Sequence, residues 1–340
     1  MILVDADVLG RRRTGDETYV SNLLRELPAV AADLRFAAIT RRPDLVPEGV
    51  EAIHVPARSQ ELRMAWTLPR LLRRLEPQLA HFQHALPLGW RGRAVLTLHD
   101  LSFERDRSSM GFADRLTFKI VVPRSARRAE HLFVVSERTK RDLVELYAVP
   151  EERVTVTPNG VDPAFSPAQE EVGTWVHMRS YLLFVGAIQQ RKNPLAALGA
   201  AHAVGLPLVV AGPEKDPALA RRLRDGGAEL RGYVEKDELA DLYRGAAALL
   251  LPSRYEGFGL PVLEAMACGT PVVASDDDAL REVAGDAAVY ARNGDLAGAV
   301  RRALAKRDEL RTAGLARARL FTWRETAAKT ADVYRRLLGA

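Results

Sequence analysis

The sequence has a single cysteine and no long apolar run, and each absence excludes a class of protein. Cys268 has no second thiol to pair with, so an internal disulfide or a cysteine-built metal centre is excluded, and a reducing cytoplasm fits. The longest apolar run, at residues 246–252, is far shorter than the roughly 18–20 residues that a membrane helix needs. The chain starts with a strand-like run that no basic stretch precedes, so we expect no signal peptide and a cytoplasmic location.

Positive charge is concentrated in one part of the chain. Residues 63–141 hold 16 Lys+Arg against 7 Asp+Glu, a local excess of nine, although the whole chain carries only +5. Two interpretations stay open: solvated helix faces, or attraction to an acidic acceptor or to the anionic inner face of a membrane. Aromatic residues are not interleaved with these arginines, so we expect no nucleic-acid partner.

Short apolar runs alternate with amphipathic segments, a pattern typical of parallel α/β architecture, and 340 residues suit about two domains. The first half predicts strands at 2–8, 36–40, 52–55, 79–83, 94–98, 131–135 and 154–157. It predicts helices at 17–27, 62–75, 112–127 and 137–147. We therefore predict a first Rossmann-like domain over residues 1–165.

A second series begins after residues 163–178, which have two prolines and no clear period and are predicted to be a linker. Its predicted strands are 182–185, 208–211, 229–233, 247–251, 272–274 and 288–290. Its predicted helices are 195–203, 218–224, 238–244, 261–267 and 296–306. This series predicts a second doubly wound domain over residues 179–322, so that two such domains would face each other across a cleft.

The segment 252–271 is predicted to form a buried strand end, a glycine-containing loop and a helix that starts near Pro261. Free backbone N–H groups at such a helix start form a favourable binding site for a diphosphate. Glu256 and Glu264 are eight residues apart and could reach different hydroxyls of one elongated ligand. Taken alone, each has a simpler explanation, because a glutamate early in a helix complements the helix dipole and a Gly-Phe-Gly sequence makes a turn.

Further motifs accompany this segment in a fixed order. They are Thr14-Gly15, His99-Asp100, Val135-Ser136-Glu137, Pro158-Asn159-Gly160-Val161-Asp162, Phe184-Val185-Gly186 and Arg191-Lys192-Asn193. Together with the E-x7-E spacing of Glu256 and Glu264, they resemble the retaining glycosyltransferases of family 4. That resemblance implies the two-lobed GT-B fold, a donor-binding second domain, and a C-terminal segment at 323–340 that crosses back onto the first domain.

The resemblance also implies roles for individual residues. His99 would approach the reacting face of the donor sugar, Glu256 would hold sugar hydroxyls, and Glu264 would hold the nucleotide ribose. Arg191 and Lys192 would neutralise the donor pyrophosphate, because fixed cations stabilise the charge that grows on a leaving phosphate. The remaining residues of the predicted donor site are Gly15, Gly186, Tyr233, Val234, Gly257, Phe258, Gly259 and Leu260.

Neither a cofactor nor a catalytic metal is expected. Asp276-Asp277-Asp278 resembles the Asp-x-Asp metal motif of other sugar transferases, but it precedes a short predicted helix, where helix capping explains it. No carboxylate is an obvious nucleophile, so we expect front-face displacement with retention of configuration. In that mechanism the acceptor hydroxyl attacks on the leaving-group side, and the departing phosphate takes its proton.

Some features depart from the family pattern. Ala187 stands where several relatives have arginine, and Gln189-Gln190 stand where an acidic residue and proline are frequent. The overall texture is most similar to bacterial mannosyltransferases of polysaccharide or glycolipid assembly, which favours GDP-mannose as donor and UDP-glucose next. A catalytically weak, nucleotide-binding partner subunit stays open as an alternative. An NAD-dependent oxidoreductase is disfavoured, because no G-x-G-x-x-G follows the first strand of either domain.

Overall fold

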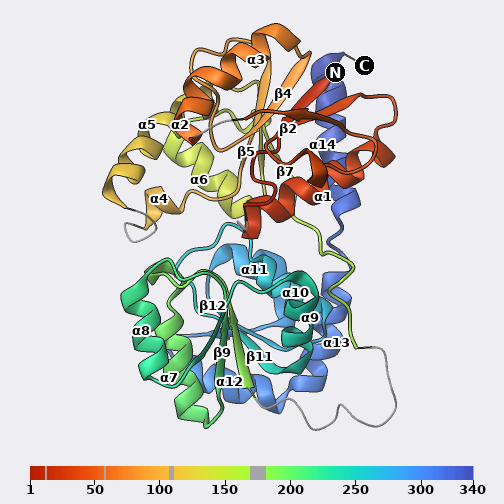
Figure 1. Ribbon diagram of the computed structural model, residues 1–340. Coiled ribbons are helices and arrows are strands. Elements are labelled where there is room, and N and C mark those ends of the chain that lie inside the picture. Colours follow the sequence, from red (N-terminus) through yellow and green to blue (C-terminus); the bar gives the residue numbers. More distant parts are fainter. Residues whose placement is uncertain (12–13, 57–58, 107–110, 169–180, 340) are drawn as a thin grey trace. The chain divides into compact units, whose positions relative to one another are not determined.

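The computed structural model of the chain describes residues 1–11, 14–56, 59–106, 111–168 and 181–339 and divides into two compact units (Figure 1). Unit 1 comprises Met1–Leu101, Phe112–Gly160 and Thr322–Ala340, and unit 2 comprises Ser102–Gly111 and Val161–Phe321. The crossing after Gly160 lies just before the predicted domain end at residue 165. Residues 102–111 group with unit 2, although we predicted them in the first domain. Most of the predicted linker at 163–178 lies outside the described residues.

Unit 1 is built on a sheet of seven parallel strands in the order β3-β2-β1-β4-β5-β6-β7. The strands are β1 (Ile2–Asp5), β2 (Phe36–Thr40), β3 (Glu51–His54), β4 (Leu79–Gln83), β5 (Ala94–Leu98), β6 (His131–Val134) and β7 (Val154–Val156). All seven predicted strands are confirmed, with ends that differ by a few residues. Because β1 lies between β2 and β4, the strand order reverses at β1 and β4, and the loops after these two strands lie at the position where open α/β sheets bind ligands.

Helices lie on both faces of this sheet (Figure 1). They are α1 (Thr14–Val30), α2 (Gln60–Leu62), α3 (Leu68–Leu75), α5 (Phe112–Arg128), α6 (Glu137–Tyr147) and α14 (Trp323–Leu338). The single helix predicted at 62–75 is wrong in one respect, because the five-residue π-helical segment η2 (Arg63–Thr67) separates α2 from α3. Arg63 is 1% exposed, and its Nη1 donates to Asp5 Oδ2 at 3.1 Å, so this irregular turn holds a buried guanidinium against the end of β1.

The C-terminal helix α14 belongs to unit 1 and packs against α1 (Figure 1). Tyr334 is fully buried and hydrogen-bonds to His81 of β4, and Arg335 pairs with Asp33 at 2.6 Å. The chain thus returns to unit 1 after unit 2 is complete. The last helix, α14, contacts α1 and β4 of unit 1.

Unit 2 has a sheet of six parallel strands in the order β10-β9-β8-β11-β12-β13. The strands are β8 (Tyr181–Val185), β9 (Leu208–Ala211), β10 (Glu229–Gly232), β11 (Ala246–Leu251), β12 (Val272–Ser275) and β13 (Val289–Ala291). All six were predicted, and every residue of β11 is buried, as expected for a central parallel strand. The order reverses at β8 and β11, so unit 2 repeats the arrangement of unit 1.

Two groups of helices pack around the unit 2 sheet, α7 with α8 and α12, and α10 with α9, α11 and α13. They are α7 (Pro194–Val204), α8 (Pro217–Asp225), α9 (Lys236–Gly245), α10 (Leu260–Ala267), α11 (Asp278–Ala284), α12 (Leu296–Ala305) and α13 (Arg307–Ala318). No helix was predicted at the position of α13. Its buried stripe is Leu310, Gly314 and Ala318, and small residues of this kind produce a weak apolar period. Unit 2 also contains the short α4 (Ser102–Arg105).

Candidate functional site

The carboxyl ends of β8 and β11 bring two loops together in unit 2. The loop after β8 runs from Gly186 to the short helix η5 (Gln190–Lys192), and the loop after β11 runs from Pro252 to the start of α10. The backbone N–H of Arg254 donates to the carbonyl of Arg191 at 2.9 Å, which joins the two loops. Ligands of open α/β sheets bind at this kind of position, outside the strand ends where the order reverses.

Glu256 is held between two cations at this edge. Lys192 Nζ lies 2.5 Å from Glu256 Oε1 and 2.8 Å from Oε2, and Arg191 Nη1 lies 3.7 Å from Oε2. The side chains of all three residues are at most 13% exposed. Arg191 also donates to the carbonyl of Tyr255, so two successive residues of the loop after β11 hold its guanidinium. The structure therefore brings together Arg191, Lys192 and Glu256, which the sequence analysis had placed in one site.

The ionisation of Glu256 follows from these neighbours. Burial alone would raise the pKa of its carboxyl, but the charges of Lys192 and Arg191 outweigh burial, and the pKa lies below its usual range. Glu256 is therefore ionised at neutral pH, and the three charged groups leave one net positive charge. An anionic ligand that approaches this edge meets that positive charge.

Glu264 lies on α10 and is almost fully buried. Its Oε2 accepts a hydrogen bond of 2.8 Å from the hydroxyl of Tyr243, a fully buried residue of α9. Burial raises the pKa of the Glu264 carboxyl to about 7, although the Tyr243 hydrogen bond acts in the opposite direction. At neutral pH this carboxyl is thus divided between its neutral and ionised forms, which makes it sensitive to a ligand that prefers one of them.

Glycines shape the loops around these side chains. Gly186 has φ +146° and Gly212 has φ +147°, and a Cβ on Gly212 would lie 2.1 Å from the Gly186 carbonyl oxygen. Only glycine allows the loops after β8 and β9 to approach so closely. Gly259, with φ +107°, precedes Leu260, the first residue of α10, and a Cβ there would lie 2.6 Å from Leu280. The predicted glycine loop at the start of this helix is present.

Some of the remaining residues predicted for the donor site in unit 2 are buried, and others are exposed. Gly257 and Phe258 belong to the loop that ends at Gly259, and Phe258 is buried against Phe321 with ring centroids 6.0 Å apart. Tyr233 and Val234 directly follow β10, and the Tyr233 side chain is 39% exposed. The carbonyl of the preceding Gly232 accepts from Gly212 N at 2.7 Å, which ties this loop to the one after β9.

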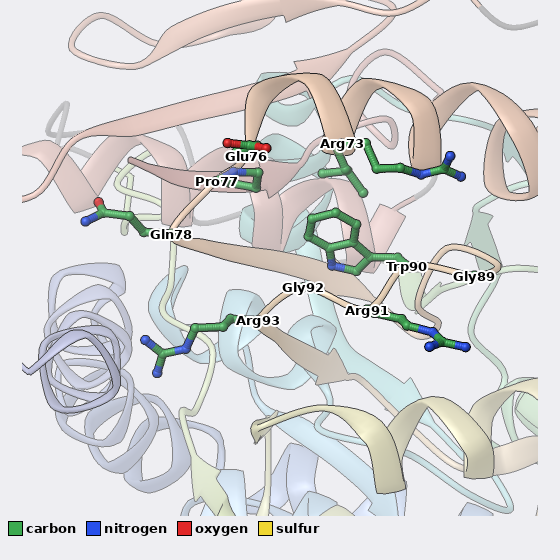
Figure 2. A pocket seen from close by; sticks show the side chains of 10 residues that line it. Arg73, Glu76, Pro77, Gln78, Gly89, Trp90, Arg91, Gly92 and Arg93 are labelled. Carbon is green, nitrogen blue, oxygen red and sulfur yellow. The ribbon is translucent and has the colours of Figure 1, made fainter.

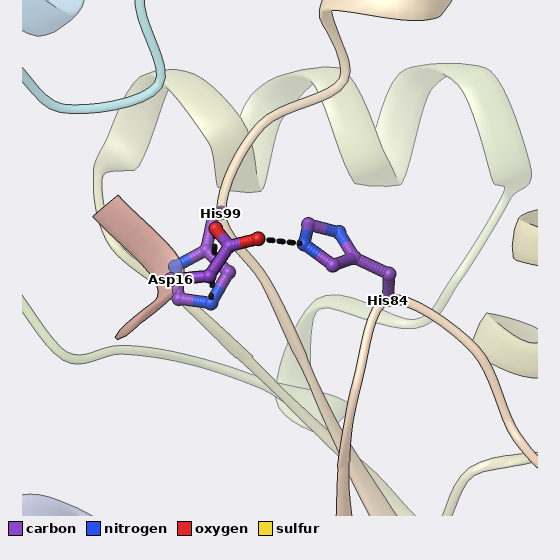
Figure 3. A group of neighbouring side chains, drawn as sticks. All are labelled: Asp16, His84 and His99. Atoms are coloured by element: carbon purple, nitrogen blue, oxygen red, sulfur yellow. Dashed lines mark hydrogen bonds and ion pairs between the residues drawn. The ribbon is translucent and has the colours of Figure 1, made fainter. Parts of the chain in front are cut away.

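Unit 1 presents a different set of side chains at its own strand ends. His99 directly follows β5, His84 directly follows β4, and Asp16 lies in the first turn of α1 next to Gly15. His84 Nε2 lies 3.2 Å from Asp16 Oδ2, and His99 Nε2 lies 3.9 Å from Asp16 Oδ1 (Figure 3). The structure thus brings His99 and Gly15 to one edge, and it adds Asp16 and His84, which the sequence analysis missed.

The environment of His99 keeps its imidazole neutral. Burial lowers its pKa to about 4, with Asp16 acting in the opposite direction and His84 adding to the decrease. Its Nε2 lies 2.9 Å from Gln83 Oε1, and the Tyr19 ring meets it edge-on with centroids 4.8 Å apart. His99 is therefore a held, uncharged group at neutral pH, suited to hydrogen bonding.

Local patterns could have indicated the missed residues. Asp16 follows the glycine that was selected, and His84 stands one position after a correctly predicted strand, where side chains reach the sheet edge. Tyr243 gave no such signal, because a tyrosine on an amphipathic helix is usually a core residue. Its contact with Glu264 joins two elements and appears only when they are packed.

Asp276-Asp277-Asp278 behaves as a helix start. Asp277 is the N-cap of α11, and its Oδ1 accepts from Ala279 N at 3.0 Å, so the predicted capping is confirmed. Asp276 pairs with Arg281. Among the described residues, the only group of three or more His, Cys, Asp or Glu side chains that could hold a metal ion is the unit 1 cluster Asp16, His84 and His99.

A separate hollow of about 560 Å³ lies in unit 1, near the amino ends of β4 and β5 (Figure 2). Trp90 and the side chains of Arg73, Arg91 and Arg93 line it. It lies at the opposite end of the strands from His84 and His99, so it is not part of the strand-end site. None of the described helices is long and apolar enough to cross a membrane.

Two family models and several known proteins match this chain. The model described as "Glycosyltransferase Family 4" matches residues 13–165, and the one described as "Glycosyl transferases group 1" matches residues 166–319. The O-antigen chain mannosyltransferase B of Escherichia coli is 30% identical over 335 residues, which cover 89% of this chain and 83% of that protein.

Solved structures share the fold. Sucrose-phosphate synthase from Thermosynechococcus elongatus aligns with a TM-score of 0.77 at 21% identity, covering 99% of both chains. The Anabaena protein HepE, solved in complex with UDP and glucose, aligns with a TM-score of 0.71 at 14% identity, covering 98% of both chains. The two units thus form the two Rossmann-like domains of the GT-B fold.

Proposed function

Because this chain belongs to glycosyltransferase family 4, we propose that it moves a hexose from a nucleotide sugar to a hydroxyl of a glycan or glycolipid, with retention of configuration. GDP-mannose is the proposed donor, since the Escherichia coli relative is a mannosyltransferase. UDP-glucose is the second candidate, and the HepE complex with UDP and glucose is consistent with it at the level of the fold.

The observation that carries the proposal is the cluster of Lys192, Arg191 and Glu256 at the point where the strand order of unit 2 reverses. A donor pyrophosphate carries two negative charges close together, and two fixed cations there stabilise the charge that develops as the glycosidic bond breaks. In the structure Lys192 pairs with Glu256. A bound pyrophosphate would share Lys192, and Glu256 could then accept hydrogen bonds from sugar hydroxyls.

The nucleotide would extend from this cluster along α10. Glu264, four residues after the start of that helix, would accept hydrogen bonds from the ribose hydroxyls. The backbone of Tyr233 and Val234 would face the base. A hydrogen bond to an ionised carboxylate is worth about 1.5–3 kcal/mol, so Glu264 would contribute a large share of nucleotide affinity. Ribose hydroxyls donate more strongly to an ionised carboxylate than to a neutral carboxyl. Because the pKa of Glu264 is about 7, ribose binding would therefore shift this group towards its ionised form.

We propose front-face displacement for the chemical step. The acceptor oxygen forms its bond to the anomeric carbon on the side from which the phosphate departs, and the phosphate oxygen takes the acceptor proton. The protein contributes orientation and electrostatics: Arg191 and Lys192 on the phosphate, and neutral His99 as a hydrogen-bonding group near the sugar. No step in this scheme requires a metal ion.

The first experiment is a thermal-shift titration with GDP, UDP, ADP and their sugar conjugates. A ligand at 100 times its dissociation constant adds about 2.7 kcal/mol to the stability of the native state. We expect one nucleotide series to stabilise the protein, and the same donor to support transfer to an acceptor. Nucleotide binding without transfer to any acceptor would favour the partner-subunit alternative. No response to any nucleotide would contradict the donor site itself.

We also propose that unit 1 makes a peripheral contact with an anionic membrane. Leu62 of α2 and Trp66 of η2 are 58% and 63% exposed, and Leu88 beside them is 71% exposed, its N–H donating to the Met64 carbonyl at 2.9 Å. The guanidinium of Arg70 stacks over the Trp66 ring at 3.1 Å. An exposed tryptophan with arginines around it suits the interface of an anionic bilayer.

This contact can be tested by sedimentation with vesicles of phosphatidylcholine, with and without phosphatidylglycerol. We expect binding to the anionic vesicles alone, reduced in Trp66→Ala. Leu320→Ala is a matched control, because Leu320 is 64% exposed in unit 2. Equal binding of both vesicle types, or an equal loss in the control, would contradict the proposal and leave the local charge excess as solvated helix faces.

A further inference from the structure

The cluster of Asp16, His84 and His99 in unit 1 has the composition of a metal site (Figure 3). Each residue offers one ligand atom, and the three atoms lie within 4.8 Å of one another. They come from three separate elements: the first turn of α1, the end of β4 and the end of β5. In Figure 3 one oxygen of the Asp16 carboxylate faces His84, and the other faces His99.

Binding a metal ion would draw the three ligand atoms, now within 4.8 Å of one another, closer together. Tetrahedral Zn²⁺ with bonds of about 2.0–2.1 Å has neighbouring ligand atoms about 3.4 Å apart. His84 Nε2 lies 3.2 Å from Asp16 Oδ2, and His99 Nε2 lies 3.9 Å from the other carboxylate oxygen, Oδ1, so coordination through one oxygen requires a rotation of the Asp16 side chain. Two imidazole nitrogens and one carboxylate oxygen form a donor set that divalent transition metals accept and that leaves further positions open.

The backbone holds His84 in a constrained conformation. Its φ is +61°, a region that non-glycine residues seldom adopt, and its N–H donates to the Thr97 carbonyl at 2.9 Å. From there its ring points at Asp16 (Figure 3). The side chains of His84, Asp16 and His99 are 27%, 31% and 12% exposed, so an ion from solvent has a path to the cluster.

We propose that Asp16, His84 and His99 bind a divalent transition-metal ion, with Zn²⁺ as the probe, and that the bound ion inhibits transfer. The inhibition rests on the proposed function, because His99 would otherwise hydrogen-bond near the donor sugar. Coordination through His99 Nε2 replaces its present hydrogen bond to Gln83 Oε1, which is 2.9 Å long. The ion thus removes His99 from its proposed role and occupies space at the same strand ends.

Binding can be measured without any substrate. Chelator-stripped protein is titrated with ZnCl₂ by calorimetry, and with Co²⁺ by absorption spectroscopy. His84→Asn is the informative variant, because asparagine tolerates positive φ and so keeps the backbone while removing the imidazole. Asp16→Asn is the second variant. His54→Ala is the control, because His54 is an exposed histidine of β3 outside the cluster.

We expect one equivalent of Zn²⁺ to bind to the wild type and to His54→Ala. Loss of an outer-shell partner typically weakens metal affinity about 10–100-fold, so loss of a direct ligand in His84→Asn should weaken it at least about tenfold. Unchanged melting temperatures of the metal-free variants would show that folding is intact. Equal affinity in the wild type and His84→Asn, or an equal loss in His54→Ala, would overturn the site.

The proposed inhibition of transfer is measured separately from metal binding. With the donor identified by thermal shift, Zn²⁺ should slow transfer by the wild type, excess chelator should restore it, and His84→Asn should need at least about tenfold more Zn²⁺ for the same inhibition. Stoichiometric binding without inhibition would overturn the inhibitory role and leave the metal site standing. Failure of transfer under all conditions would instead contradict the proposed function, and the calorimetric result would still decide the site.

Discussion

The two units share one strand order but differ in the side chains at their strand ends. In both units the first strand lies next to the fourth, and the strand order reverses between them. The loops that follow these two strands therefore lie at the reversal point. Unit 2 places there two cations, a carboxylate between them and closely approaching glycines. Unit 1 places there two histidines and an aspartate. The shared topology thus provides a position in each unit, and the residues at that position determine which chemistry it supports.

The largest expected effect tests the cationic edge of unit 2. Lys192→Ala should lower the rate of sugar transfer about 10²–10³-fold, because loss of one preorganised group that stabilises transition-state charge has this cost. The measurement is the steady-state rate with the donor that thermal shift identifies. Lys215→Ala is the control, because Lys215 is an exposed lysine in a neighbouring loop. A loss below threefold would remove Lys192 from the proposed mechanism.

The second effect concerns Glu264. Glu264→Ala should weaken nucleotide binding about 10–100-fold, through loss of charged hydrogen bonds worth about 1.5–3 kcal/mol. Calorimetric titration with the nucleoside diphosphate measures this loss. Glu264→Gln is the matched variant, since its amide oxygen still accepts from Tyr243 while the charge is absent. Unchanged affinity in both variants would contradict the role proposed for Glu264.

A pH dependence follows from the pKa of Glu264 near 7. If ribose hydroxyls prefer the ionised carboxylate, nucleotide affinity should rise about tenfold from pH 6 to pH 8 and then level off. Because burial raises this pKa above the value of about 4.5 that a glutamate has in the unfolded chain, the titration also affects stability. Between pH 4.5 and 7 the native state holds a proton that the unfolded chain releases, so stability falls as pH rises. Glu264→Gln should show neither trend, and a parallel trend in that variant would assign the titration to another group.

Two glycine substitutions sharpen the comparison between the units. A Cβ on Gly212 would lie 2.1 Å from the Gly186 carbonyl oxygen, whereas the described residues leave no atom within 4 Å of a Cβ on Gly15. Gly212→Ala should therefore lower the melting temperature markedly. Gly15→Ala should leave it unchanged but weaken donor binding about two- to tenfold, because the added methyl group would hold the phosphate away from the backbone and weaken a hydrogen bond to it. Equal melting temperatures of the two variants would contradict this distinction.

The last prediction is that removal of metal ions has no effect on the rate of sugar transfer. Excess chelator should leave the rate of sugar transfer undiminished, because the proposed mechanism needs no metal, and it should relieve any inhibition by bound Zn²⁺. A rate measured before and after dialysis against chelator checks this. Loss of activity that Mg²⁺ or Mn²⁺ restores would show that the metal-free mechanism is wrong.

The strands were predictable from the sequence because buried parallel strands are short apolar runs bounded by polar turns. The irregular elements were not: η2 depends on a buried Arg63 reaching Asp5, and α13 packs through Gly314 and Ala318 rather than through large apolar residues. Motifs indicated Arg191, Lys192, Glu256 and His99. The turn glycine and the strand end next to Asp16 and His84 could have indicated these two residues singly. Their contact with each other, like that of Tyr243 with Glu264, joins separate segments and appears only in the folded chain.

The placement of α14 also bears on how the protein is made. The seven strands of unit 1 emerge from the ribosome before residue 161, yet Tyr334, which hydrogen-bonds to His81 of β4, is synthesised only after residue 321. All but ten residues of unit 2 form one continuous stretch, Val161–Phe321, which emerges before α14. Unit 1 is therefore begun before unit 2 and completed after it, and a nascent chain that stalls before residue 322 carries all of unit 2 while unit 1 still lacks α14.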